Sequence, residues 1–212
     1  MKKAFIDLDG TLLDSTSRHI TVLEDALSHY SVEHKDVSIF VSYKADGHNT
    51  KKYLEEIIGL DAELAAQVSA YWVEHIEDEK YLRQDVLYDD SDSFLQALVK
   101  MGYENIVITA RRNENYITRF LKTAPIKQWL TDVIVVSPME AKTAKAQILE
   151  REKTPDSILI GDTEVEYSSG SEAGIRTFLL NRGFRSRKYW DMHKVQSFGN
   201  LMEIRNLLNE GL

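Results

Sequence analysis

Two carboxylates stand one residue apart near the start of the chain, directly after a short apolar run. The stretch is Phe5-Ile6-Asp7-Leu8-Asp9-Gly10-Thr11. On a regular strand, side chains at i and i+2 share a face, so Asp7 and Asp9 repel each other unless a cation offsets their charge. Oxygen ligands of this kind suit Mg²⁺, which also accepts phosphate oxygens. The alternative is a plain turn, which is what an isolated Asp-x-Asp-Gly usually forms.

Polar residues also follow other apolar runs of the same kind. Thr109 comes after Ile106-Val107-Ile108, and Asp162 comes after Ile158-Leu159-Ile160-Gly161. In open α/β sheets, ligands bind at the carboxyl ends of the strands, where the strand order reverses. Lys142 lies in the segment after a further apolar run. We therefore expect carboxylates, a hydroxyl and an ammonium group to meet on one rim of a sheet.

The apolar runs alternate with helical patterns. Five runs have the length and β-branched content of buried parallel strands, at residues 4–6, 106–108, 133–136, 158–160 and 177–180. Helices are expected over residues 92–101, 115–122 and 138–152, the last opened by a capping box at Ser137-Pro138-Met139-Glu140. This alternation predicts an α/β fold with a doubly wound, Rossmann-like parallel sheet.

The alternation stops between Asp14 and about Asp85. Only amphipathic helical patterns occur there, over residues 20–30, 50–58 and 62–80. We predict a core domain made of residues 1–14 and 86–212, and a small all-helical cap domain made of residues 15–85.

Composition excludes several classes of protein. The chain has 212 residues, 43% of them hydrophobic, which is enough for one good core and a second small one. The absence of cysteine excludes disulfides, thiolate metal sites and cysteine nucleophiles. A net charge of -8 argues against nucleic acid as a partner. Because no apolar stretch approaches the length of a membrane span or a signal-peptide core, we expect no membrane partner and a cytoplasmic location. The oligomeric state is not predicted.

Together, these motifs resemble the haloacid dehalogenase superfamily, specifically its phosphatases with a helical cap inserted after the first motif. The matching pieces are Asp7-Leu8-Asp9-Gly10-Thr11, Ile108-Thr109, Lys142 and Gly161-Asp162-Thr163-Glu164-Val165-Glu166, followed by Glu172-Ala173-Gly174. They occur in the order that the family uses and extend over nearly the whole chain.

The resemblance implies a Mg²⁺-dependent phosphomonoester hydrolase acting on a small phosphorylated metabolite. Asp7 is then the nucleophile that forms an aspartyl-phosphate. Asp9 protonates the leaving alcohol and later activates the hydrolytic water. The metal is held at the rim by Asp7, Asp9 and Asp162, with the main-chain carbonyl of Leu8.

The substrate phosphoryl group has its own implied contacts. Thr109 and Ala110 bind its oxygens, and Lys142 neutralises its charge. Lys145 lies one helical turn away, and Lys142 is preferred because Ile148 and Leu149 follow it at the offset where the family's helix enters the core. Thr109 has a structural alternative, as the cap of the following helix.

Three neighbours of these motifs receive weaker roles. Glu166 stands where the family often has aspartate, and it is expected to reach the metal through water or to hold the lysine. Arg111 and Arg112 are expected to be exposed loop residues outside the site.

The segment Asp46-Gly47-His48-Asn49-Thr50 resembles, by position, the cap loop that contacts the substrate's leaving group. His48 is the expected substrate contact. The alternative is a helix–helix turn with Asn49 or Thr50 as the N-cap. Two other functions remain open, a phosphomutase of the same fold and a non-catalytic binding module.

Overall fold

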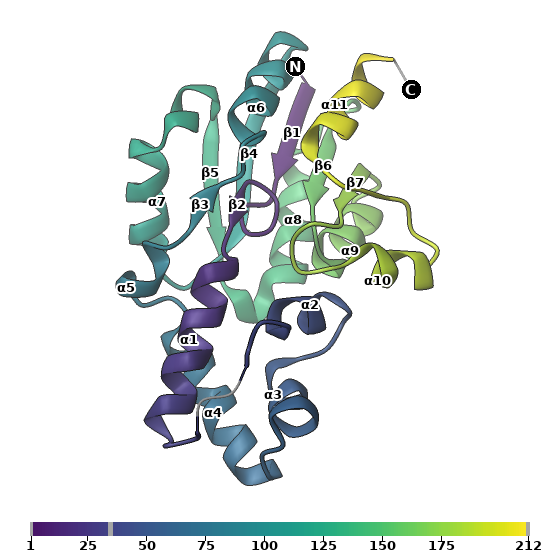
Figure 1. The fold of residues 1–212 in the computed structure, drawn as a ribbon. Helices are drawn as coiled ribbons and strands as arrows, with labels where there is room; N and C mark the ends of the chain where they lie inside the picture. The colour runs from purple at the N-terminus through teal and green to yellow at the C-terminus, as the bar shows by residue number, and fades with distance from the viewer. Residues whose placement is uncertain (1, 34–35, 211–212) are drawn as a thin grey trace.

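The computed structural model describes residues 2–33 and 36–210. Its centre is a six-stranded parallel sheet with the strand order β5-β4-β1-β6-β7-β8 (Figure 1). The strands are β1 (Lys2–Ile6), β4 (Tyr103–Ala110), β5 (Asp132–Val136), β6 (Ile158–Gly161), β7 (Arg176–Leu180) and β8 (Ser197–Phe198). All five expected strands are present, and β1 lies between β4 and β6, where the strand order reverses.

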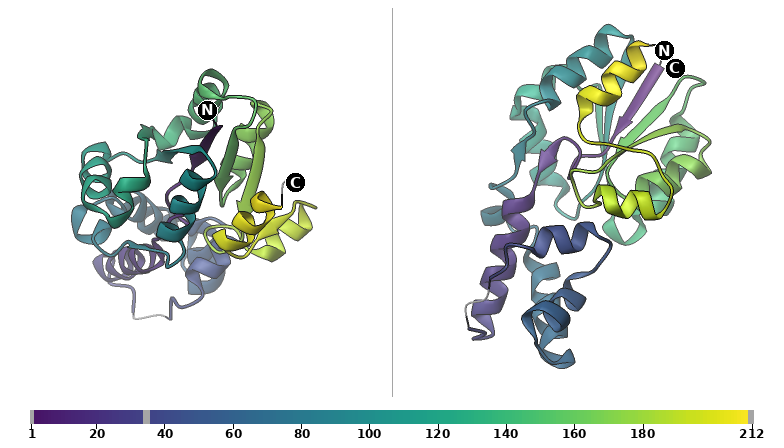
Figure 2. Two further views of the ribbon diagram at one scale, coloured as in Figure 1. Left: turned by 90° about the horizontal axis from the view of Figure 1, so that it is seen from above. Right: turned by 45° about the vertical axis from the view of Figure 1, so that its right-hand side comes forward.

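Helices cover both faces of this sheet, as predicted (Figure 2). Because strand side chains alternate, Ala4 and Ile6 of β1 pack on one face and Phe5 packs on the other. The first face is covered by α6 (Ser91–Lys100), α7 (Glu114–Thr123) and α11 (Leu201–Asn209). The second face contacts α8 (Ala141–Glu152), and the chain after α9 (Glu164–Glu172) also packs there. The doubly wound α/β fold is confirmed.

The segment between the first two sheet strands is helical. It contains α1 (Thr16–His29), α2 (Phe40–Ala45), α3 (Thr50–Tyr53), a π-helical turn (Leu54–Ile58), α4 (Ala62–His75) and α5 (Glu79–Leu82). These elements share an apolar core of their own, which includes Leu23, Tyr53 and Trp72. The single helix expected over residues 62–80 is wrong, because the chain turns at residues 76–78. The division into cap and core domains stays a prediction, which this separate apolar core supports.

The helical segment leaves and rejoins the core through a two-stranded antiparallel ribbon, β2 (Leu13–Asp14) paired with β3 (Val86–Leu87). The two predicted domain boundaries, after Asp14 and before Val86, therefore lie side by side. A second connection comes from the segment after β7, which leads into α10 (Arg187–Met192). There, Ser186 donates its backbone N–H to the carbonyl of Ala45 at 2.8 Å, and Lys188 pairs with Asp46 at 2.6 Å.

The expected capping box at residues 137–140 is wrong in detail. Ser137 instead caps a 3₁₀ turn (Pro138–Glu140), and α8 begins at Ala141. A capping box does occur at the start of α9, where Thr163 and Glu166 bond reciprocally. Another short 3₁₀ helix (Pro125–Trp129) precedes β5. Within the described ranges, no helix is long and apolar enough to cross a membrane.

Candidate active site

The predicted rim forms at the carboxyl ends of β1, β4 and β6. A pocket of about 140 Å³ opens there. It is lined by Asp7, Asp9, Thr109, Ala110, Ala141, Lys145, Asp162, Thr163, Val165, Glu166 and Phe184. The two carboxylates of the first motif, the hydroxyl near the end of β4 and the carboxylate after β6 are thus brought together. The first motif lies at least 100 residues before the other two in the sequence, but parallel strands end at one edge of the sheet.

The lysine of the site is Lys145, and the preference for Lys142 is corrected. The ammonium group of Lys145 lies 2.6 Å from Asp7 Oδ1 and 2.6 Å from Glu166 Oε1, with only 2% of its side chain exposed. Lys142 is exposed on the same helix. The two differ by three positions, so their side chains point only about 60° apart around the helix axis, and the border between the exposed and the buried side of α8 falls between them. The main-chain carbonyl of Lys142 accepts a hydrogen bond from Ser169 instead.

Two carboxylates, Asp7 and Glu166, contact this ammonium group, and a third, Asp162, lines the same pocket. Burial raises the pKa of Asp7 to about 7, although Lys145 acts in the opposite direction. Burial, with the nearby charges of Asp7 and Glu166, also raises the pKa of Asp162 well above its usual value. Burial acts against ionisation of Glu166 too, but Lys145 and hydrogen bonds from Thr163 outweigh it and lower that pKa. The site therefore carries an excess of buried negative charge.

This charge and one orphaned atom fit a divalent cation. Asp162 Oδ1 is buried without a hydrogen-bond partner, while Oδ2 accepts the backbone N–H of Phe184 at 2.5 Å. No cluster of three acidic or histidine side chains with metal-site geometry occurs in the described part of the chain. Two carboxylates are nevertheless sufficient for Mg²⁺, which keeps several waters and takes substrate oxygens as further ligands.

The predicted main-chain ligand is corrected as well. The Leu8 carbonyl accepts hydrogen bonds from the backbone N–H groups of Leu12 at 2.9 Å and Leu13 at 2.8 Å. These bonds close the tight turn after β1, so both lone pairs of this oxygen are already engaged. The Leu8 carbonyl therefore is not available as a metal ligand.

Asp9 is held by two arginines, Arg18 and Arg111. Arg111 was expected to be an exposed loop residue outside the site, but it is buried. Arg111 Nε lies 2.7 Å from Asp9 Oδ2 and Arg18 Nη2 lies 2.7 Å from Asp9 Oδ1. Both guanidinium groups also contact Asp85, at 3.1 and 3.0 Å respectively. Burial opposes ionisation of Asp9, but Arg111 and Arg18 outweigh it and lower its pKa.

This buried cluster of two arginines and two aspartates joins separate parts of the fold. Arg18 comes from the first turns of α1, Asp85 precedes β3, and Arg111 follows β4. The position of Arg111, directly after the last residue of β4, was a signal that could have identified it. No comparable signal marks Arg18, because it is one polar residue among many in an amphipathic helix. Lys145 therefore pairs with Asp7, whereas the two arginines pair with Asp9. Because both oxygens of the Asp9 carboxylate are engaged by the arginines, this carboxylate is not positioned as a metal ligand.

Gly10 allows the turn after the first motif to approach Asp162. Its φ is +73°, and a Cβ added there would lie 2.2 Å from Asp162 Oδ2. Gly183 lies against the same oxygen from the other side, where an added Cβ would be 2.1 Å away. A side chain at either position would displace the carboxylate, so both glycines are required for the packing at Asp162.

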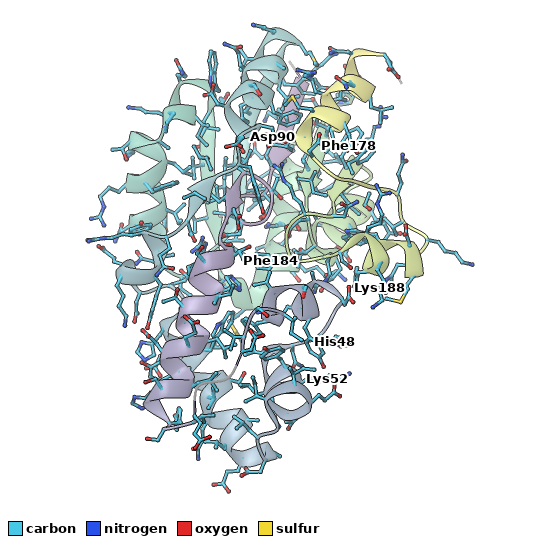
Figure 3. The ribbon with its side chains drawn as sticks, viewed as in Figure 1. His48, Lys52, Asp90, Phe178, Phe184 and Lys188 are labelled. Carbon is cyan, nitrogen blue, oxygen red and sulfur yellow. The ribbon has the colours of Figure 1, made fainter. Side chains whose placement is uncertain are left out.

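Thr109 and Ala110 line the pocket as expected, and Asn113, not Thr109, caps α7. His48 does not line the pocket. Its ring packs 4.3 Å from that of Tyr43, and Figure 3 shows it on the helical segment, away from Phe184. Asn49 caps α3 by accepting the backbone N–H of Lys52, so the helix–helix turn is the correct interpretation of this loop. The expected contact of His48 with substrate is not supported by this placement.

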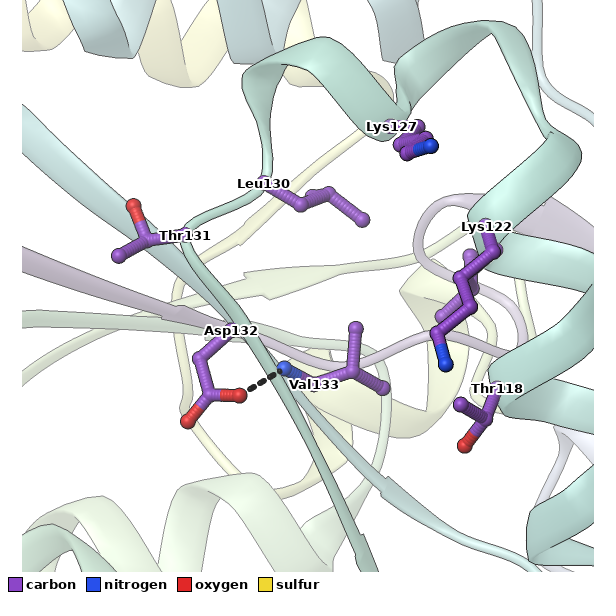
Figure 4. Close-up of a pocket in the computed structure, with 8 residues that line it drawn as sticks. Thr118, Lys122, Lys127, Leu130, Thr131, Asp132 and Val133 are labelled. Carbon is purple, nitrogen blue, oxygen red and sulfur yellow. Dashed lines mark hydrogen bonds between the residues drawn. The ribbon is translucent and has the colours of Figure 1, made fainter.

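A second cavity, of about 300 Å³, lies at the other end of the sheet (Figure 4). It is formed between α7, the 3₁₀ helix before β5 and the first residues of β5, including Lys122, Leu130 and Val133. Its lining includes Lys127 and one carboxylate, Asp132, which accepts the N–H of Val133. None of the strand-end residues of the rim reaches it, so the chemistry belongs to the first pocket.

The fold and the rim together define a class of protein, the α/β enzymes whose acidic site lies at strand ends beside a helical insertion. Within this class, the chain belongs to the haloacid dehalogenase-like hydrolases, because the model of that family matches residues 5–180. The superfamily predicted from the motifs is confirmed.

Individual relatives are distant in sequence but similar over their full length. The chain is 22% identical to pyrophosphatase PpaX from Bacillus mycoides over 96% of both chains. The fold matches a predicted phosphatase from Clostridium acetobutylicum with a TM-score of 0.73, 17% identity and coverage of 99% of this chain and 98% of that one. It also matches a predicted phosphoglycolate phosphatase from Haemophilus somnus with a TM-score of 0.70, 15% identity and 98% coverage of each.

Proposed function

We propose that this hydrolase is a Mg²⁺-dependent phosphatase that cleaves a small phosphomonoester through an aspartyl-phosphate on Asp7. The observation that carries the proposal is the contact between the Asp7 carboxylate and the buried Lys145 ammonium in a pocket that Thr109 and Asp162 also line. The names of the relatives, a pyrophosphatase and phosphatases, agree with phosphoryl transfer.

Asp7 is the nucleophile in this proposal. Lys145 holds one of its oxygens at 2.6 Å, which leaves the other free to attack phosphorus. The same ammonium group, with the Thr109 hydroxyl and the backbone at Ala110, stabilises the charge on the transferring phosphoryl group. Glu166 accepts from Lys145 at 2.6 Å and from Thr163 Oγ1 at 2.6 Å, so it fixes the position of the lysine.

Asp9 transfers protons. Arg18 and Arg111 lower its pKa, so the arrangement described favours the carboxylate, the form that accepts a proton from the attacking water in the second step. In the first step Asp9 donates a proton to the leaving oxygen. That step requires the protonated form, and therefore a geometry in which at least one guanidinium contact to Asp9 is broken.

Asp7 and Asp162 would hold Mg²⁺ through their carboxylates. When bound, the ion neutralises the excess of carboxylates and polarises the phosphoryl group. The orphaned Asp162 Oδ1 and the raised pKa values of Asp7 and Asp162 support a cation at this place.

The size of the pocket supports a small substrate. Sites for drug-sized ligands occupy about 300–1,000 Å³, whereas this pocket holds about 140 Å³. A phosphoryl group with a short leaving group fits such a volume, and a nucleotide does not.

The test measures phosphate release from a panel that includes 2-phosphoglycolate, pyrophosphate, sugar phosphates and p-nitrophenyl phosphate. Each is assayed with Mg²⁺ and with chelator, beside Asp7→Asn. We expect turnover that needs both Mg²⁺ and Asp7, and Asp7→Asn to lose at least about 10³-fold in kcat, as removal of a nucleophile does. Chelator-insensitive hydrolysis, or hydrolysis that survives Asp7→Asn, would contradict the mechanism. Interconversion of sugar phosphate isomers without phosphate release would indicate a mutase.

A further inference from the structure

One short segment of the chain contacts both the Asp162 carboxylate and the helical segment. This bridging segment, residues 183–188, follows β7 and runs into α10. Phe184 donates its backbone N–H to Asp162 Oδ2 at 2.5 Å. Arg185 pairs with Glu164, two residues after Asp162, at 2.5 Å. The orientation of the Asp162 carboxylate, and with it the direction of its unpartnered Oδ1, therefore depends on where the bridging segment lies.

The far end of the bridging segment is bonded to the loop after α2. The backbone N–H of Ser186 donates to the carbonyl of Ala45 at 2.8 Å. The Ser186 hydroxyl donates to Asp46 Oδ1 at 2.6 Å, and Lys188 pairs with Asp46 Oδ2 at 2.6 Å. Both oxygens of the Asp46 carboxylate are thus bonded to the bridging segment, although Asp46 is not among the residues that line the catalytic pocket.

Polar contacts carry much of this docking, because the space beside them is not filled. A cavity of about 500 Å³ is lined from the helical segment by Tyr43 and its neighbours, and from the other side by Asn181 and its neighbours. Phe184 adds one ring contact, at 4.5 Å from the ring of His19 in α1. Figure 3 shows Phe184 at the junction between the sheet and the helical segment, with Lys188 farther along in α10.

The Phe184 N–H lies between two anchors of the chain. The anchor before it is Arg182, which pairs with Asp90 at 2.8 Å and donates to the carbonyl of Thr11 at 2.7 Å. The anchor after it is the set of bonds to Asp46. Loss of either anchor frees one end of the bridging segment and widens the range of positions that the Phe184 N–H can take, whereas a metal ligand must be held within about 0.5 Å.

We propose that Asp46 is a positioning residue for the metal site, because it anchors the bridging segment that orients Asp162 toward a divalent cation. This inference rests on the proposed Mg²⁺-dependent function and assigns part of the Mg²⁺ affinity to a residue outside the pocket. Loss of a group that bonds directly to a metal ligand typically weakens metal binding by about 10- to 100-fold. Asp46 acts one step farther away, so a smaller effect is expected.

The experiment measures the Mg²⁺ dissociation constant of the metal-free protein from the rise of its melting temperature with Mg²⁺ concentration. The variants are Asp46→Ala and Lys188→Met. The matched control is Glu55→Ala, which removes one negative charge from an ion pair with Lys51 inside the helical segment. Hydrolysis of p-nitrophenyl phosphate is followed in parallel, at limiting and at saturating Mg²⁺.

We expect Asp46→Ala to raise the Mg²⁺ dissociation constant by about 3- to 10-fold. Lys188→Met should raise it by about 2- to 5-fold, since this pair is partly exposed. Glu55→Ala should leave it unchanged. The first two substitutions change the net charge in opposite directions, so a general electrostatic effect would move the affinity in opposite directions. A shift in the same direction is therefore specific to the anchor.

At saturating Mg²⁺, the kcat of Asp46→Ala should return to within about twofold of the wild type, because Asp46 lies outside the pocket. If Asp46→Ala does not fold, Lys188→Met provides the same test from the exposed partner. The charge-swapped double variant Asp46→Lys with Lys188→Asp should recover most of the Mg²⁺ affinity.

An unchanged Mg²⁺ dissociation constant in Asp46→Ala, or shifts of opposite sign in the two variants, would overturn the positioning role while p-nitrophenyl phosphate hydrolysis still reports a working phosphatase. A loss of kcat that saturating Mg²⁺ does not recover would overturn it as well. A wild type that binds Mg²⁺ but hydrolyses no ester would instead remove the proposed function, and the dissociation constants of the variants would still decide the role of Asp46.

Discussion

Replacing Lys145 with methionine is the sharpest test of the site, because it removes the ammonium group that contacts both of the buried carboxylates Asp7 and Glu166. Methionine has a similar length and fills the same space, so the change removes charge with little change of volume. Lys142→Met is the matched control. Lys142 lies on the same helix and undergoes the same substitution, but its side chain is exposed.

The expected loss of stability in Lys145→Met follows from the two ion pairs that the substitution removes. Both contacts of Lys145 measure 2.6 Å, and its side chain is 2% exposed. Removing one partner of a buried ion pair destabilises a protein by about 3–5 kcal/mol, because the remaining charge stays buried without compensation. Surface substitutions such as Lys142→Met stay within about 0.5 kcal/mol. The loss for Lys145→Met is therefore a large part of a typical stability of about 5–15 kcal/mol.

The loss of stability caused by Lys145→Met should be larger at neutral pH than at acidic pH. In the wild type Lys145 lowers the pKa of Glu166, so the stability gained from this pair is present at neutral pH and is lost as pH falls through the lowered value. Without Lys145, Glu166 takes up a proton more readily in the folded state. The stability difference between wild type and Lys145→Met should therefore shrink as the pH is lowered from 7 to 4.

Urea unfolding of the metal-free proteins at pH 7 and at pH 4 measures both effects, and phosphate release with Mg²⁺ measures activity. We expect Lys145→Met to lose stability at pH 7 and at least about 10²-fold in kcat, and Lys142→Met to retain both. If the two variants behave alike, or if Lys142→Met is the inactive one, the assignment of the lysine is wrong.

Three further predictions follow from particular contacts. Burial raises the pKa of Asp7 to about 7, so the free energy of unfolding that depends on protonated Asp7 is present at low pH and is lost as pH rises toward 7. About two pH units of this range lie above pH 5, at about 1.4 kcal/mol each. The metal-free wild type should therefore lose about 3 kcal/mol of stability between pH 5 and 8, and Asp7→Asn should not lose it. Urea midpoints of both proteins in chelator at the two pH values check this, and parallel curves would contradict it. Gly10→Ala should lower the melting temperature and abolish Mg²⁺-dependent activity, because the new Cβ crowds Asp162 and the backbone φ of +73° is strained for alanine. Gly59→Ala is the control, since Gly59 has a φ of +84° but no atom within 4 Å of an added Cβ, and it should cost only about 1–2 kcal/mol of strain. Equal melting temperatures of the two variants would argue against crowding at Asp162. Arg111→Met should destabilise the fold by about 3 kcal/mol, because Asp9 and Asp85 then share Arg18 alone. It should lower kcat by a larger factor than it changes KM. A change confined to KM would place Arg111 in substrate binding instead.

Local patterns were sufficient to predict the frame of the site. Short apolar runs such as residues 158–160 have the length and β-branched content of buried strands. The polar residues at their ends, Asp7, Thr109 and Asp162, are then expected to meet where parallel strands end together. The helical insertion was predictable for the same reason, since its apolar residues recur with the period of a helix. Helix ends were less predictable, as the turn at residues 76–78 shows, because no glycine or proline marks it.

What the sequence alone determined about this protein is therefore the order of strands and helices, and with it which polar residues stand at strand ends. Only the tertiary structure decided which charges meet. Lys142 and Lys145 have the same chemistry, and the rotation of α8 against the sheet buries one and exposes the other. Arg18, Asp85 and Arg111 contact Asp9 because three distant segments converge on it. Such contacts depend on packing directions in three dimensions, whereas periodicity describes only one face of one element at a time.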